Sequence, residues 1–285
     1  MQKTLIYIIG AGRSGTTVLD IMLGNVNGSI SLGEINRFFK RNGIPPKREK
    51  ESKVYNFWIN LKDQMLGSGF NDMLYLQKLS QQNEYHLAFI KSIFKKCNTE
   101  YVNAIVEQYD FIGQNTSQNV LIESSKYPVR ALNLSNYLDS DQFQIKYIYL
   151  KKDPEKVVKS FQKKNLEQPS KGFFMANLYY LIVNILCGIT IRILKSKGHR
   201  VSTLRYEDLI STPKETLLKL GSDIDEDYSE LIRKLIIKEP LNTGYVFDGN
   251  RIRLKETLIL RDSDTKEKIK GKLSFTRIFN YIVYR

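Results

Sequence analysis

One stretch constrains the fold more than any other, residues 5–17, Leu-Ile-Tyr-Ile-Ile-Gly-Ala-Gly-Arg-Ser-Gly-Thr-Thr. Its five leading apolar residues predict a buried strand, and a glycine-rich turn separates them from an apolar helical pattern. Such a turn leaves free backbone N–H groups and the positive end of the helix facing the same point. Arg13 adds a cation there, and Ser14, Thr16 and Thr17 add hydroxyl groups. The segment therefore predicts a site for a phosphate or sulfate group.

The glycine spacing fits more than one kind of nucleotide-binding loop. Gly10 and Gly15 have the Walker A spacing, but Thr16 stands where that loop has lysine, which disfavours an ATPase or a kinase. Gly10, Gly12 and Gly15 also match G-x-G-x-x-G, and Glu34 lies near the distance expected for a ribose-binding acid. A third interpretation, a loop that holds a phosphosulfate group, depends on residues further along the chain.

Short apolar runs alternate with helical sequence after the first strand. They lie at residues 30–32, Val120–Ile122, Ile145–Leu150 and Val201–Leu204. Strands alternating with helices are typical of a parallel sheet covered by helices. We therefore expect an α/β fold of the P-loop type with a central parallel sheet flanked by helices.

The segment at about residues 38–115 breaks this alternation with helical patterns only. Apolar residues share one helical face at 54–65, again at Leu87, Ile90, Ile93 and Phe94, and again at 101–109. The chain of 285 residues is large enough for one substantial core. We expect a single domain over residues 1–285, with residues 38–115 as a helical insertion.

Composition limits the partners and the compartment. The net charge of +14 indicates an acidic partner, such as a nucleotide, an acidic glycan, a membrane surface or nucleic acid. Cys97 and Cys187 have neither a close partner nor a metal-ligand spacing, which indicates reduced thiols and a cytoplasmic protein. Residues 173–194 resemble a membrane span, but their Asn, Gly and Arg residues favour a buried core helix, and we expect no transmembrane segment.

Polar residues follow the later strands. In a parallel sheet, ligands bind beyond the carboxyl ends of the strands. Glu123-Ser-Ser-Lys126 follows one expected strand, and Lys151-Lys-Asp-Pro154 follows the next, with Ser160 six residues later. Arg205-Tyr-Glu-Asp-Leu209 follows the last. Together with residues 5–17, they predict one composite site.

At these motifs the chain resembles the sulfotransferases that use 3′-phosphoadenosine 5′-phosphosulfate (PAPS). Residues 13–17 resemble the family's 5′-phosphosulfate loop, and Ile148–Ser160 resembles its 3′-phosphate motif, with Lys152 in place of the usual arginine. The stretches 123–126 and 205–209 are similar to others in the family, and residues 248–253 resemble its late Gly-Asn-x-x-Arg loop. The resemblance covers the whole chain and is strongest to carbohydrate, tyrosylprotein and bacterial members.

The resemblance implies a role for each matching residue. Arg13 would stabilise the 5′-phosphate leaving group, Glu34 would be the general base, and Lys126 would stabilise charge. The residues implied in donor binding are Gly12, Arg13, Ser14, Gly15, Thr16, Thr17, Lys152, Ser160 and Arg251. Should Glu34 not be the base, Glu84 and Glu107 of the insertion are the next candidates.

The resemblance also implies the reaction and its partners. We expect transfer of a sulfuryl group from PAPS, without a metal, to a hydroxyl acceptor that binds the insertion. The basic balance favours a carbohydrate or another anionic acceptor, while protein tyrosine, lipid and small alcohols stay open. We expect no nucleic-acid partner. The alternatives are an NAD(P)-binding oxidoreductase of the Rossmann type, which the first motif alone supports, and a basic module that binds polyanions.

Overall fold

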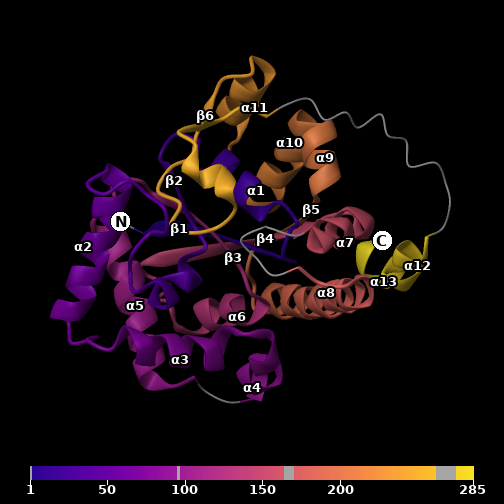
Figure 1. Ribbon diagram of the computed structural model, residues 1–285. Helices are drawn as coiled ribbons and strands as arrows, with labels where there is room; N and C mark the ends of the chain where they lie inside the picture. Colours follow the sequence, from indigo (N-terminus) through magenta and orange to yellow (C-terminus); the bar gives the residue numbers. More distant parts are fainter. Residues whose placement is uncertain (1, 95–96, 164–169, 261–273) are drawn as a thin grey trace.

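The computed structural model, which describes residues 2–94, 97–163, 170–260 and 274–285, has a central five-stranded sheet (Figure 1). The strand order is β2-β3-β1-β4-β5, and all four pairings are parallel. The strands are β1 (Lys3–Gly10), β2 (Ser29–Gly33), β3 (Val120–Lys126), β4 (Phe143–Lys151) and β5 (Val201–Arg205). This arrangement confirms the predicted fold class.

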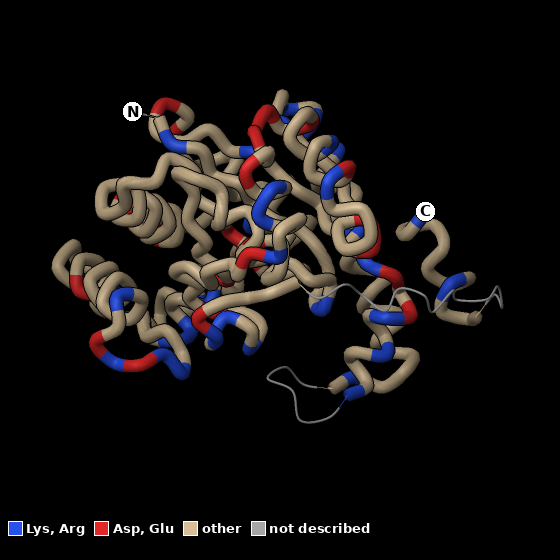
Figure 2. Tube along the Cα trace, turned by 90° about the horizontal axis from the view of Figure 1, so that it is seen from above, with Lys and Arg blue, Asp and Glu red and all other residues tan. Residues whose placement is uncertain are grey.

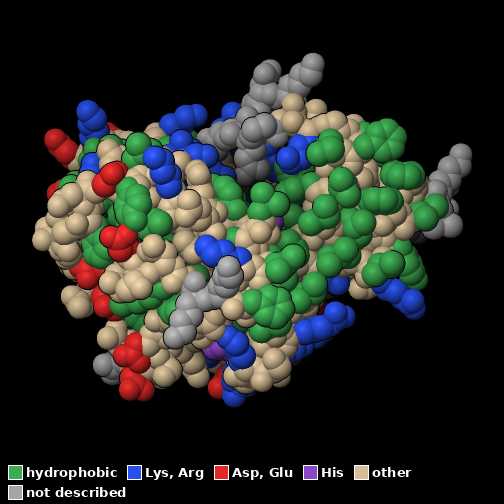
Figure 3. Space-filling view, turned by 90° about the horizontal axis from the view of Figure 1, so that it is seen from below, with side chains coloured by type: hydrophobic (Ala, Val, Ile, Leu, Met, Phe, Trp, Pro, Cys, Tyr) green, Lys and Arg blue, Asp and Glu red, His purple; other side chains and the backbone are tan. Residues whose placement is uncertain are grey.

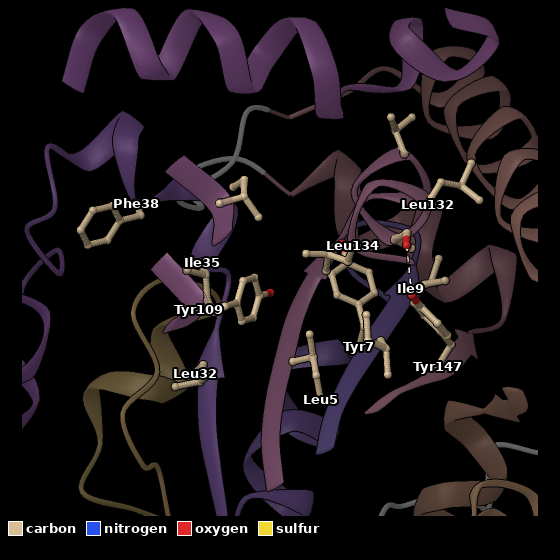
Figure 4. Packing of buried hydrophobic residues seen from close by; sticks show 14 of the residues in the cluster. Leu5, Tyr7, Ile9, Leu32, Ile35, Phe38, Tyr109, Leu132, Leu134 and Tyr147 are labelled. Atoms are coloured by element: carbon tan, nitrogen blue, oxygen red, sulfur yellow. Dashed lines mark hydrogen bonds between the residues drawn. The ribbon is translucent and has the colours of Figure 1, made fainter. Parts of the chain in front are cut away.

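Both faces of the sheet are buried, which explains why the strands read as continuous apolar runs. Leu5, Tyr7 and Ile9 of β1 point into one core with Tyr147 and Tyr109, as Figure 4 shows. Ile6 and Ile8 point into a second core on the opposite face. The sheet is therefore the middle layer of three.

Helices cover each face of the sheet (Figure 1). The second core holds side chains of α1 (Thr16–Leu23), α9 (Tyr206–Ser211), α10 (Pro213–Ile224) and α11 (Ser229–Ile236). The first core holds side chains of α6 (Pro128–Tyr137), α7 (Pro154–Gln162) and α8 (Phe173–Ser196). Each strand but β2 is followed directly by a helix on one of these faces, as a parallel sheet requires.

Between β2 and β3 lie the helices of the predicted insertion. They are α2 (Lys53–Gly67), α3 (Met73–Glu84), α4 (Phe89–Phe94) and α5 (Thr99–Gln114), with the short 3₁₀ turns η1 (Ile35–Arg37), η2 (Phe39–Arg41) and η3 (His86–Ala88). Trp58 of α2 and Tyr109 of α5 are fully buried in the first core. The insertion is thus packed on the sheet rather than set apart from it.

The last part of the chain returns to the sheet edge and to α8. A small antiparallel pair, β6 (Leu241–Asn242) and β7 (Thr257–Leu258), flanks the 3₁₀ turn η4 (Arg251–Leu254). The short helices α12 (Phe275–Phe279) and α13 (Tyr281–Tyr284) lie beside α8 (Figure 1). Within the described residues, α8 alone is long and apolar enough to cross a membrane, with a mean hydropathy of 1.8, and 44% of its most apolar stretch is buried in the protein.

Two details differ from the sequence interpretation. Glu123-Ser-Ser-Lys126 forms the last part of β3 rather than following it, because Glu123 and Lys126 still pair with Tyr7 and Ile9 of β1. The helical face that contains Leu87 and Phe94 points outward, with these side chains 100% and 80% exposed. The periodicity identified a shared face, but no part of the chain that the structure describes covers that face.

Candidate active site

The loop after β1 places the start of α1 at the carboxyl edge of the sheet. Gly15, immediately before α1, has a φ of +94°, and a Cβ atom there would lie 2.3 Å from the ring of Tyr206. Only glycine fits this position without strain or a clash. The first N–H groups of a helix have no intrahelical acceptor, so this end of α1 is suited to an anion.

A cavity of about 290 Å³ opens at this point. Its lining comes from residues at or after the carboxyl ends of all five strands, including Ser160 of α7, and from η4 and the loop before it. The lining residues are Arg13, Gly15, Thr16, Thr17, Val18, Glu34, Arg37, Lys126, Lys152, Ser160, Tyr206, Gly249, Asn250, Arg251 and Ile252. Most of the residues predicted from sequence therefore meet around one space.

Two predicted residues lie elsewhere. Gly12 lines a neighbouring cavity, and its N–H group donates a hydrogen bond to the Tyr179 hydroxyl at 3.1 Å. Ser14 is buried, and its hydroxyl donates to the Ala11 carbonyl at 2.7 Å. The Ser14 side chain thus stabilises the loop from within.

Glu34 lies at the centre of the polar lining. It directly follows β2, its side chain is only 4% exposed, and one carboxylate oxygen contacts the Lys126 ammonium group. The other carboxylate oxygen is 2.8 Å from Arg37 Nε. Two cations therefore hold one buried carboxylate at a fixed orientation, and all three side chains line the cavity.

Asp248 fixes the loop that closes this side of the cavity. Its carboxylate contacts Arg41 at 3.0 Å and both Arg37 and Arg253 at 3.3 Å, and it accepts the Gly249 N–H group at 2.7 Å. Burial alone would raise the pKa of Asp248, but the neighbouring arginines and this N–H group bring that pKa below its usual value. The carboxylate thus stays charged and holds the loop in place.

The same cavity contains the second predicted anion site. Lys152 follows β4, its ammonium group is 4.0 Å from the centroid of the Tyr206 ring, and burial lowers its pKa. Ser160 lies on α7 and lines the same cavity. Asp153 begins α7 and accepts the N–H groups of Glu155 and Lys156, which sets the direction of this helix.

A second cavity of about 200 Å³ adjoins the first and shares Glu34, Arg37 and Lys126 with it. The rest of its lining is Gly10, Gly12, His86, Ser125, Tyr127, Phe161, Lys171 and Tyr179. Burial lowers the pKa of His86 to about 4, so its imidazole is neutral at neutral pH. This cavity is thus more aromatic than the first, with cations at its border.

The remaining candidates lie away from both cavities. Glu84 is fully buried in contact with Arg130 and Tyr101, and Glu107 accepts a hydrogen bond from Ser68. Within the described ranges, no group of three or more His, Cys, Asp or Glu side chains is placed to hold a metal ion. Glu34 is therefore the acid that both cavities share.

Comparison with known proteins identifies the fold. No protein-family model and no curated protein matches this chain. Among solved structures, the sulfotransferase domain from the curacin biosynthetic pathway aligns with a TM-score of 0.55 at 17% identity, over 100% of this chain and 99% of that one. The sulfotransferase domain of the Synechococcus PCC 7002 olefin synthase aligns with a TM-score of 0.53 at 17% identity, over 99% of this chain and 94% of that one. The chain has the sulfotransferase fold.

On this sulfotransferase fold, several residues of the two cavities were not predicted from the sequence. Tyr206 lies within the stretch 205–209 already singled out, and Arg37 lies three residues after Glu34, so their positions after strands were a usable signal. His86 and Tyr179 come from the insertion and from α8, and no motif marks either residue. Their place beside Gly12 and Glu34 depends on packing between helices.

Proposed function

We propose that this protein transfers a sulfuryl group from PAPS to an acceptor hydroxyl. One observation carries the proposal: a single cavity contains the start of α1, the Lys152 and Ser160 pair, and a buried carboxylate. The donor has one anionic group at the 5′ position and another at the 3′ position of its ribose, so it needs two separate anion sites, of which only the 5′ site lies beside the reacting centre.

The charge of the cavity suits such a donor. Among the lining residues, Glu34 is the single acid, and the cations are Arg13, Arg37, Lys126, Lys152 and Arg251. Arg13 and the first turn of α1 would hold the 5′-phosphosulfate. Lys152 and Ser160 would hold the 3′-phosphate. The prediction that PAPS is the donor rests on these two separate anion sites.

The reaction needs a base and a stabilised leaving group. The acceptor oxygen would form a bond to sulfur, while the bond from sulfur to the 5′-phosphate oxygen breaks and adenosine 3′,5′-bisphosphate leaves. The Glu34 carboxylate would take the acceptor proton, and Arg13 would stabilise the negative charge on the leaving phosphate. Lys126 and Arg37 would orient Glu34, because each contacts one of its oxygens.

The second cavity is the proposed acceptor site. It shares Glu34 with the donor cavity, so an acceptor hydroxyl there would approach the base from the other side. Tyr127, Phe161 and Tyr179 offer aromatic surfaces, and Lys171 offers a cation. These groups support the predicted carbohydrate or anionic acceptor, with the insertion contributing His86. Donor and acceptor would then lie in one domain.

The alternatives from sequence receive less support. A Rossmann dinucleotide fold has the strand order 3-2-1-4-5-6, whereas here β3 lies between β2 and β1. Figure 2 shows Lys and Arg spread along the chain among Asp and Glu, rather than gathered into one stripe as a nucleic-acid binder needs.

Cys97 and Cys187 are both free thiols, which supports the proposed cytoplasmic location.

Ligand-induced stabilisation tests the donor. Adenosine 3′,5′-bisphosphate should raise the melting temperature, since it binds the native state, whereas NADP and ATP with magnesium should raise it much less. Transfer of label from radioactive PAPS to a panel of glycan, tyrosine and alcohol acceptors then tests the reaction. Equal stabilisation by NADP would contradict the proposed donor.

A further inference from the structure

A broad apolar surface lies on α8 and on the two C-terminal helices. We call it the apolar face, and its exposed side chains include Phe174, Met175, Ile182, Ile278, Tyr281 and Ile282. Phe174 is 74% exposed and Ile282 is 87% exposed. Figure 3 shows hydrophobic side chains gathered over the half of this side of the molecule that carries α8, α12 and α13. Contiguous apolar surface of this kind marks a place of interaction.

The three helices form one continuous surface. The ring of Phe275 on α12 lies 5.8 Å and 6.1 Å from those of Phe173 and Phe174, centroid to centroid. Beneath this contact, the buried Asn280 side chain donates a hydrogen bond to Asn177 Oδ1 at 3.0 Å. The C-terminal helices are thus fixed to α8, and they enlarge its apolar surface instead of covering it.

A second apolar group lies beside α8. Leu87, Ile90 and Phe94 are 100%, 73% and 80% exposed. They belong to η3 and α4, and the neighbouring His86 ring is 6.3 Å from that of Tyr179 on α8. The apolar stripe that sequence analysis identified at 87–94 therefore adds to the exposed apolar surface on the α8 side.

The charge of these segments is of one sign. Residues 86–94, 172–200 and 274–285 contain no Asp or Glu, whereas Arg192, Lys195 and Arg285 are exposed cations among them. The nearest acids on α7, Asp153 and Glu155, are paired with Arg277. At the edge of the apolar face, Glu207 accepts the Tyr284 hydroxyl of α13 at 3.3 Å. Within the three described segments named above, the charged side chains are all cations, and an apolar surface that carries such cations complements an anionic amphiphile, which is the chemistry of a bilayer with acidic headgroups.

The structure favours a membrane surface over two other occupants of the apolar face, which are a second copy of this chain and the interior of a membrane. Two copies of the same face would bring like charges together on a chain of net charge +14, which disfavours self-association. A membrane span would require α8 to leave the core, yet its inner side chains Ala176, Val183 and Cys187 are at most 1% exposed. Only the outer face of α8 is available, so the helix would lie along a membrane surface.

We propose that the apolar face attaches this protein peripherally to a membrane that contains anionic lipid. The aromatic and aliphatic side chains would enter the interfacial zone, and the surrounding Arg and Lys side chains would contact lipid phosphates. Since the face is distinct from the two cavities, this attachment does not depend on the proposed sulfuryl transfer.

Vesicle flotation tests the proposal with the full-length protein. The protein should float with phosphatidylcholine vesicles that contain phosphatidylglycerol, and much less with phosphatidylcholine alone or at high salt. The double variant Phe174→Glu with Ile282→Glu should lose at least about tenfold in vesicle affinity, since both side chains would carry charge into the interface. The matched control Leu218→Glu with Ile236→Glu makes the same charge change at 52% and 66% exposed positions on α10 and α11. This control should float like the parent.

Several outcomes would overturn the attachment. They are failure of the parent to float, equal flotation of the face variant, or a parent dimer that the face variant abolishes while neither binds vesicles. Thermal melting checks that the variants are folded, and the single variant Ile282→Glu, near the end of the chain, serves if the double variant is unstable.

Discussion

Glu34 and Glu123 lie at neighbouring strand ends, since Gly33 pairs with Glu123 across β2 and β3, yet their surroundings differ. Glu34 contacts Lys126 and Arg37 and lines both cavities. Glu123 is fully buried, contacts Arg130 at 2.7 Å and accepts the Tyr109 hydroxyl. Both are ion-paired carboxylates, but only Glu34 is open to a ligand. Access of a ligand to the carboxylate, rather than the presence of an ion pair, therefore distinguishes a binding site from a structural cluster.

Asp20 extends the comparison to a carboxylate held by neutral donors. It lies on α1 and accepts hydrogen bonds from the Gly33 N–H group at 3.0 Å and from the Ser124 hydroxyl. Burial raises the pKa of Asp20 to about 7. The short stretch Glu123-Ser-Ser-Lys126 thus contributes Glu123 and Ser124 to buried interactions and Lys126 to the cavity.

The largest effect on stability is expected from breaking the buried cluster. Arg130→Met leaves Glu84 and Glu123 without their cation and should lower the free energy of unfolding by about 3–5 kcal/mol. Urea denaturation measures this loss. Arg233→Met is the matched control, because Arg233 is exposed and 3.6 Å from Glu239, and it should change stability by less than about 1 kcal/mol. Equal effects would show that the cluster is not structural.

Asp20 should make stability depend on pH in a defined window. Its pKa in the folded protein, about 7, lies above the ordinary 3.8, so between these values the unfolded chain binds fewer protons than the folded one. The free energy of unfolding therefore falls as pH rises from about 4 to about 7, by about 4 kcal/mol at 1.36 kcal/mol per unit. Asp20→Asn should remove this fall while the amide oxygen keeps both acceptor roles. Parallel slopes for parent and variant would rule out the raised pKa.

Substitutions of residues that line the two cavities should change activity rather than stability. Arg13→Ala removes a positive charge where the leaving group develops its negative charge, which should cost about 2–4 kcal/mol in transition-state stabilisation. The measurement is kcat/KM for sulfate transfer, with Arg233→Ala as the exposed control. Turnover that stays at the parent's level would remove Arg13 from the proposed machinery.

Glu34→Gln tests the base directly. The amide keeps the size of the side chain but takes no proton from the acceptor, so kcat should fall by roughly 100-fold or more. Donor affinity should stay near that of the parent. Glu107→Gln is the matched control, since Glu107 accepts a hydrogen bond from Ser68 and lies away from both cavities. A kcat within a few-fold of the parent would mean that another group takes the proton.

Much of the lining of the donor cavity could be predicted from the sequence, because its residues belong to local patterns. The loop 10–17, the Lys152 and Ser160 pair, and Glu34 each follow a recognisable strand, and strand ends of a parallel sheet converge. For the same reason, the sheet and its flanking helices were predictable from alternation alone.

The buried cluster around Arg130 and the second cavity depend on contacts between elements that are distant in the sequence. Arg130 of α6 meets Glu84 of α3, and Tyr179 of α8 meets Gly12, across separations that no local period encodes. Periodicity also fails to tell a covered face from an exposed one, as Leu87 and Phe94 show. Such features follow from tertiary packing, which a single sequence does not display locally.

The smallest effect is expected at the proposed 3′-phosphate site. Ser160 lies on α7 and lines the same cavity as Lys152. The two would form the 3′-phosphate site, away from the reacting sulfur. Ser160→Ala removes one hydrogen bond to a charged group, which corresponds to roughly tenfold weaker donor binding. Because that bond would be the same in the ground state and the transition state, KM for PAPS should rise while kcat changes little. Steady-state kinetics with isothermal titration of adenosine 3′,5′-bisphosphate separate the two quantities, and Ser211→Ala, at an exposed position on α9, is the control. A fall in kcat at unchanged donor affinity would instead place Ser160 next to the chemistry, and it would reverse the proposed orientation of the donor.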